Sequence, residues 1–277
     1  AASLERRMRR PVMSGLHALY SVGGLVGAMV GGVVAGRGIG TSAHLLGAAV
    51  VVAGVALVIT PLLLPQREDG GGGSGGRVRL TKRRLVLMGV GAFCVLFGEG
   101  AVADWSAVYL RDARMAGPAL AAAGYAAYSL MMAVGRFAGD ALILRLGARR
   151  GVRLGAATAA TGMMVALLAP GANWSILGFA AVGAGFSSIY PSVLAGAGRL
   201  KGAPPASSIA VVSSMGYVGL LAGPPLIGFV AEATNLPIGF GLVALTSGAI
   251  VLLARVIPPS EEYRPRRVAR PREAAAY

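Results

Sequence analysis

The sequence predicts an all-α integral membrane protein built as a bundle of bilayer-crossing helices. Its 277 residues are 55% hydrophobic and only 13% charged, whereas a soluble domain carries about 25% charged residues. The apolar stretches are continuous and do not alternate every second residue, which favours helices over a membrane barrel. The 43 glycines are typical of transmembrane helices that approach one another closely.

Eight segments are long and apolar enough to cross a hydrocarbon core of about 30 Å, which takes about 20 helical residues. They lie near residues 11–36, 43–65, 85–110, 118–144, 151–170, 174–198, 206–231 and 236–257.

The basic residues of the loops support this count. If the N-terminus is cytoplasmic, the inside loops and the two ends of the chain carry nearly all of the 26 Lys and Arg residues. The outside loops carry only Arg37, Arg111 and Arg114, and Arg136 lies within a span. This asymmetry is typical of a multi-pass protein whose short cytoplasmic loops are basic. We therefore expect eight spans with both termini in the cytoplasm.

One connection divides the chain into two parts. Residues 66–84 (QREDGGGGSGGRVRLTKRR) are glycine-rich and then basic, which predicts a flexible cytoplasmic linker. Residues 1–65 before it hold two spans, and residues 85–257 after it hold six. Residues 258–277 form a basic, proline-broken tail that we expect to be disordered and to lie near anionic headgroups.

Three segments resemble the major facilitator superfamily of transporters. They are the loop GRFAGDALILRLGARR (135–150), the glycine- and proline-rich SMGYVGLLAGPPLIGFVAE (214–232) and the glycine-rich SGLHALYSVGGLVGAMVGG (14–32). The loop departs from the family's motif, because Leu144 stands where the family often has an acid and Asp140 stands where it has a glycine. Together with EGAVADWSAVYLRD (99–112), residues 14–28 are most similar to the bacterial MosC-like permease branch.

The resemblance implies the last eight helices, numbers 5–12, of a twelve-helix protein made of two six-helix halves, with the first four helices missing. It implies a multi-pass protein of the bacterial inner (cytoplasmic) membrane, monomeric once complete, that moves a small-molecule substrate by alternating access. We expect proton coupling and a small polar organic solute such as a sugar or cyclitol. A drug or metabolite exporter of the same superfamily and a truncated, non-transporting remnant are the alternatives.

Glu99 is the candidate for proton coupling. Counted from Leu85, it lies about 21 Å along a helix within a core of about 30 Å. A carboxyl at that depth is costly unless it is protonated or paired with a cation, and such groups mark proton pathways. The structural alternative is a hydrogen-bonded glutamate that fixes helix packing. Asp104 lies near the outer surface beside Trp105, and we interpret the two as an interfacial acid with an aromatic anchor.

Six further residues are candidates for contact with the substrate, because they are polar and lie on helices that line the central cavity in the family. They are His17, Tyr20, Tyr128, Ser187, Ser188 and Tyr217. Each could instead serve a helix–helix contact.

A second group is a candidate for gating. Arg136 and Asp140 are four residues apart, which suits an ion pair on one helix face. The resemblance implies that they act with the loop residues Arg145, Gly147, Arg149 and Arg150 to hold a closed state. Charges that reach toward the headgroups at a helix end are the alternative.

Several functions are excluded by what the sequence lacks. There is no H-E-x-x-H or G-x-S-x-G motif and no cluster of acids, so an intramembrane enzyme is not expected. One cysteine, Cys94, and two histidines provide no disulfide framework, metal site or cofactor site. Because the charge of +15 is distributed over loops, we expect no nucleic-acid partner.

Overall fold

The computed structural model describes residues 39–62, 78–200 and 202–258, together with Leu19, Val30, Val34 and Arg37. Most of the span expected at 11–36, including His17 and Tyr20, lies outside these residues, as do most of the linker and nearly all of the tail.

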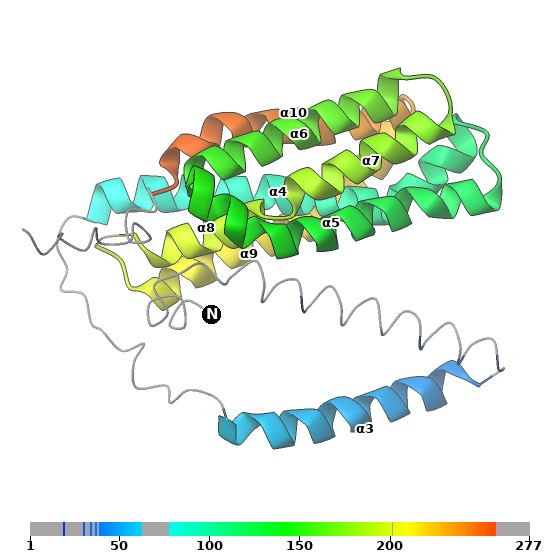
Figure 1. Cartoon of the computed structure of the whole chain (residues 1–277). Helices are drawn as coiled ribbons and strands as arrows, with labels where there is room; N and C mark the ends of the chain where they lie inside the picture. Colours follow the sequence, from blue (N-terminus) through cyan, green and yellow to red (C-terminus); the bar gives the residue numbers. More distant parts are fainter. Residues whose placement is uncertain are drawn as a thin grey trace, which may run out of the picture.

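The described residues form helices joined by short connections (Figure 1). In chain order they are α3 (Thr41–Ile59), η1 (Thr60–Leu62), α4 (Val78–Ala113), α5 (Pro118–Leu146), α6 (Ala148–Leu168), α7 (Ala172–Phe186), α8 (Ile189–Gly198), α9 (Pro205–Ala233), α10 (Leu236–Leu253) and η3 (Ala254–Val256). Seven stretches of this part of the chain are long and apolar enough to cross a membrane, with α7 and α8 counted as one. They coincide with seven of the eight predicted segments.

Two elements differ from the sequence prediction. Residues 78–84, assigned to the linker, form the first turns of α4, because nothing between Val78 and Leu85 breaks a helix. The segment expected at 174–198 is interrupted at Ser187 and Ser188, between α7 and α8. Pro191 has no N–H to donate to the Ser187 carbonyl four residues earlier, which accounts for the interruption.

Helices α4 to α10 pack as one bundle, whereas α3 does not pack against this bundle (Figure 1). α4 lies along α9 and also contacts α5 and α10, and α7 lies between α5 and α6. Glycines set these close approaches. A Cβ at Gly219 or Gly223 of α9 would meet the backbone of Phe93 or Phe97 of α4. Because both pairs are four residues apart, they form the small-residue contact typical of membrane helices.

Candidate substrate and coupling site

The stretch Gly98-Glu99-Gly100 fixes the position of Glu99 on α4. A Cβ at Gly98 would lie 2.6 Å from the Phe186 ring of α7, and one at Gly100 would lie 2.6 Å from the Leu220 carbonyl of α9. Successive helical residues are about 100° apart, so the two glycines face neighbours on either side of Glu99. The glutamate side chain therefore leaves α4 in a third direction, toward α5.

Arg136 of α5 meets Glu99 there. The guanidinium Nη2 lies 3.7 Å from the Glu99 Oε1, and the two side chains are 8% and 27% exposed, respectively. The sequence spacing indicated Asp140 as a partner of Arg136, and that pairing stays a prediction. Spacing could not show the Glu99–Arg136 contact, since Glu99 and Arg136 lie on different helices. Asp140 is half-buried one turn farther along α5. Glu99 is thus an ion-paired carboxylate that stays partly accessible.

Two buried tyrosines flank this pair. The Tyr128 side chain of α5 is 3% exposed, and it interacts electrostatically with Glu99 and Arg136. Its hydroxyl has no hydrogen-bond partner among the described residues. Tyr190 of α8 also interacts with Glu99, and its hydroxyl forms a hydrogen bond with Ser213 of α9. We call Glu99, Arg136, Tyr128 and Tyr190 the Glu99 site; it is built from α4, α5 and α8, with α9 beside it.

The other candidates for substrate contact are more dispersed. The Tyr217 side chain is 57% exposed and interacts electrostatically with Tyr190, so it lies at the edge of the Glu99 site. Ser187 and Ser188 are buried at the α7–α8 interruption, and the Ser187 hydroxyl donates to the Ala184 carbonyl at 2.7 Å. A Cβ on Gly135 would meet the Ser187 side chain, so this serine fills the α5–α7 contact. The sequence did not select Tyr190, although it is polar and lies on the same segment.

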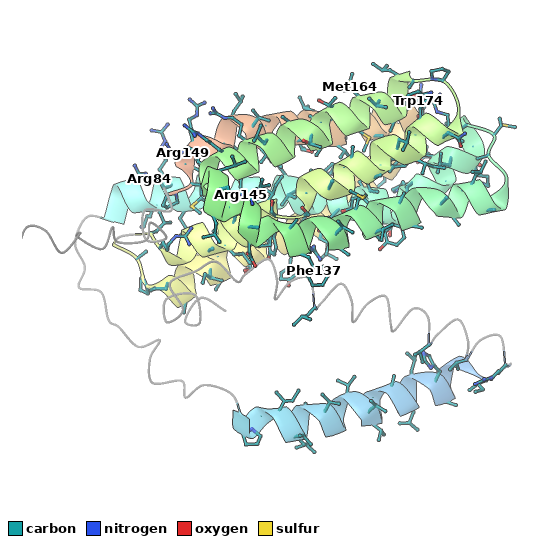
Figure 2. All side chains as sticks on the ribbon, viewed as in Figure 1. Arg84, Phe137, Arg145, Arg149, Met164 and Trp174 are labelled. Carbon is teal, nitrogen blue, oxygen red and sulfur yellow. The ribbon has the colours of Figure 1, made fainter. Side chains whose placement is uncertain are left out.

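The gating candidates lie at the end of the bundle where α5 passes into α6. Gly147 joins the two helices with a φ of 78°, a conformation that favours glycine. Arg145, Arg149 and Arg150 are exposed around it, and Arg149 donates to the Ile257 carbonyl at 3.2 Å. Arg84, Arg145 and Arg149 lie at this end, and Trp174 lies at the opposite end (Figure 2). We call the end that carries these arginines the basic end.

Trp105 does not act as a simple interfacial anchor. Its Nε1 donates to the Pro224 carbonyl of α9 at 2.9 Å, and a Cβ on Gly228 would lie 3.0 Å from its ring. Asp104 beside it is exposed. The indole therefore joins α4 to α9 beside the Pro224-Pro225 pair, a contact that no local sequence pattern indicates.

A second polar cluster, which the sequence did not predict, lies at the end opposite the basic end. The Ala166 carbonyl near the C-terminus of α6 accepts hydrogen bonds from the Tyr109 hydroxyl, Arg114 Nη2 and the Ser175 hydroxyl at 2.8–2.9 Å. Arg114 also donates to the Leu167 carbonyl and to Ser175, and its guanidinium lies 5.5 Å from the centre of the Tyr109 ring. These are the carbonyls that a helix end leaves without internal partners. We call this group the Arg114 cap.

The described residues contain no group of three or more His, Cys, Asp or Glu side chains that could hold a metal ion.

Comparison with known proteins decides the family. Residues 1–208 match the family model of the Major Facilitator Superfamily. The chain belongs to this superfamily. Its membership, its membrane-length helices and its bacterial relatives identify a multi-pass protein of the cytoplasmic membrane and a member of a transporter family, not of an enzyme family.

Three curated relatives of this superfamily member align over most of it. An uncharacterised MFS-type transporter of Yersinia pestis is 34% identical over 262 residues, which is 93% of this chain and 66% of the relative. The uncharacterised transporter y4wD of Sinorhizobium fredii is 32% identical, over 93% of this chain and 68% of its own length. The membrane protein MosC of Rhizobium meliloti is 30% identical, over 92% of this chain and 62% of its own length. The chain therefore spans about two thirds of the length of these relatives.

Solved structures show the same superfamily fold. A crystal structure of the E. coli fucose:proton symporter FucP superposes with a TM-score of 0.62 at 21% identity, covering 78% of this chain and 54% of FucP. FucP in the outward conformation gives a TM-score of 0.63 at 22% identity over the same shares. At this identity the likeness concerns the fold alone.

Proposed function

We propose that the protein works as a secondary active transporter that moves a small polar organic solute, such as a sugar or cyclitol, together with protons. The arrangement that supports this most directly is the Glu99 site. It combines an ion-paired carboxylate, 27% exposed, with the phenol groups of Tyr128 and Tyr190 inside a membrane bundle. Charged groups at membrane depth are costly, so they are retained where an ion or solute passes.

Each part of the site has a role in this proposal. Glu99 takes up and releases the coupled proton, and Arg136 stabilises its ionised form. The tyrosines supply hydroxyl donors and acceptors that match the hydroxyl groups of a neutral, polar solute. Tyr217 extends the hydroxyl-bearing surface toward the exposed side of α9.

The proposal also includes the architecture that the described residues do not test. Residues 1–65 supply the last two helices of a first bundle, residues 85–257 supply a complete second bundle, and both termini lie in the cytoplasm with the basic end. Alternating access then rocks one bundle against the other. Once complete, the protein acts as a monomer in this proposal.

A transport assay with a pH reporter tests the proposal. Cells expressing the full chain receive a panel of sugars, cyclitols and cationic drugs, and wild type is compared with Glu99→Gln. Asp104→Asn is the matched control, because it neutralises an exposed acid on the same helix outside the site.

A sugar or cyclitol that triggers a pH change in wild type and in Asp104→Asn, but not in Glu99→Gln, supports the proposal. Solute movement without a pH change, unaffected by Glu99→Gln, contradicts proton coupling. A response restricted to the cationic drugs contradicts the solute class and favours an exporter.

A further inference from the structure

The Tyr128 hydroxyl is a buried hydroxyl group of the Glu99 site whose hydrogen-bonding capacity is unused among the described residues. The side chain is 3% exposed, and the hydroxyl has no partner. A buried donor without a partner raises the free energy of the arrangement that contains it. Such a group is therefore expected to acquire a partner in another arrangement of the same site.

Glu99 is the acceptor that geometry offers. It interacts electrostatically with both Tyr128 and Arg136, which are eight residues apart on α5 and so about 12 Å apart along its axis. Helical side chains lean toward the N-terminus of their helix, so the long Arg136 side chain reaches back toward Tyr128. Arg136 and Tyr128 are therefore two possible partners for the Glu99 carboxylate on one helix, Arg136 toward the basic end and Tyr128 toward the opposite end.

The separation within the ion pair leaves the carboxylate room to turn. At 3.7 Å the Arg136 nitrogen and the Glu99 oxygen are farther apart than in a charge-assisted hydrogen bond, which measures about 2.7–2.9 Å. The surroundings are fixed, in contrast. Gly98 and Gly100 hold the backbone of Glu99, a Cβ on Gly183 would meet the Tyr128 carbonyl, and the Tyr128 ring stacks on Tyr125 with 6.1 Å between centroids. The Glu99 side chain is therefore the part that can move.

Among the described residues, Tyr128 is the hydroxyl group acting on Glu99 that is buried without a hydrogen-bond partner. Tyr190 of α8 interacts with Glu99, but its hydroxyl already forms a hydrogen bond with Ser213. On α9, Tyr217 interacts with Tyr190. Helices α7 and α10, which pack on either side of Gly98, carry no titratable residue. Arg136 and Tyr128 are the groups on α5 that act on Glu99, and Tyr125 acts on Tyr128.

We propose that Glu99 is a two-position carboxylate: ionised, it pairs with Arg136 as in this structure, and protonated, it turns away and accepts a hydrogen bond from the Tyr128 hydroxyl. Tyr128 keeps its own proton and acts as a positioning residue. The carboxyl carries its proton away from the basic end when it turns. The role of this movement in transport rests on the proposed function, whereas the existence of the two positions does not.

Infrared difference spectroscopy detects the second position directly. Spectra of the purified full chain in lipid nanodiscs are recorded between alkaline and acidic buffer for wild type, Glu99→Gln, Tyr128→Phe and Tyr125→Phe. Tyr125→Phe is the matched control, because it removes the hydroxyl of the stacked neighbour. The carbonyl stretch of a protonated carboxyl falls in frequency when the carbonyl accepts a hydrogen bond, so the band reports its partner.

We expect an acid-induced carboxyl band that is absent in Glu99→Gln, shifts to higher frequency in Tyr128→Phe and is unchanged in Tyr125→Phe. A band that Tyr128→Phe leaves unchanged, or the absence of any band sensitive to Glu99→Gln, overturns the two-position carboxylate. A Tyr128-sensitive band in a protein that moves no solute supports this inference and overturns only the transport proposal. Proton-coupled uptake together with a carboxyl band that Tyr128→Phe leaves unchanged supports the transport proposal and overturns this inference.

Discussion

The bundle contains two buried polar clusters that use their hydrogen bonds in opposite ways. In the Arg114 cap, one carbonyl accepts from three side chains, and Arg114 donates to three acceptors. In the Glu99 site, the ion pair is 3.7 Å long and the Tyr128 hydroxyl has no partner among the described residues. A saturated network fixes a single arrangement. In an unsaturated network the partners can change, and this one contains Glu99, the residue that the sequence suggested for proton coupling.

The aromatic side chains near the two clusters differ in the same way. Tyr109, Phe179 and Phe240 beside the cap form a closed aromatic cluster with centroids 5.4–5.9 Å apart, and all three are fully buried. Near the Glu99 site, Tyr125 and Tyr128 stack, but Tyr125 is 45% exposed. The cap therefore joins α4, α6, α7 and α10 into a rigid end, while the Glu99 site keeps an accessible side.

The largest effect is expected from separating Glu99 and Arg136. Glu99→Gln or Arg136→Gln alone removes one charge of this ion pair, which costs up to about 3 kcal/mol for a buried pair and less here because Glu99 is partly exposed. The double variant Glu99→Gln/Arg136→Gln removes both charges, so we expect it to regain most of the lost stability. Thermal unfolding in detergent measures all three.

Additive losses in the double variant would mean that the two charges do not stabilise each other, and the ion pair would then be irrelevant to the site.

The next effect concerns the cap. Arg114→Met removes three hydrogen bonds and a cation–π contact, and we expect a loss of about 2 kcal/mol with proton coupling retained. Arg111→Met is the control, because Arg111 is exposed and its ion-pair partner among the described residues is its neighbour Asp112. Thermal unfolding and the pH-reporter assay measure stability and proton coupling in both variants. Loss of coupling without loss of stability in Arg114→Met would place function in the cap.

The smallest effect is expected from Asp104→Asn. The side chain is exposed and lies outside both clusters, so stability should change by no more than about 0.5 kcal/mol. A large loss of solute-triggered pH change in this variant, with unchanged unfolding temperature, would show that the Glu99 site is not the only acidic element of coupling.

The helices could be predicted from the sequence because apolar length is a local property. The seven described spans follow the hydrophobic runs, and the interruption at Ser187 and Ser188 follows from Pro191 once the Pro is read as a missing donor. The start of α4 was missed because a run of basic residues hides a helix from a measure of apolarity.

The site could be predicted only in part, because its contacts join residues far apart in the chain. Depth within an apolar run singled out Glu99, and polarity singled out Tyr128, but neither reveals that Arg136 faces α4. Local spacing indicates only pairs on one helix, such as Arg136 and Asp140. The Arg114 cap could not be predicted for the same reason. In the sequence Arg114 is an ordinary loop charge, and only the fold brings it to the end of α6.

Two tyrosine-to-phenylalanine variants compare the clusters most directly. Tyr109→Phe removes a hydroxyl that donates to Ala166 at 2.9 Å, so thermal unfolding should show a loss of about 1 kcal/mol and the solute-triggered pH change should persist. Tyr128→Phe removes a buried hydroxyl without a partner among the described residues, so stability should stay the same or rise while the pH change falls. Equal losses of stability in the two variants, with coupling unchanged in both, would contradict the distinction between a saturated structural cap and an unsaturated site that we propose for proton coupling.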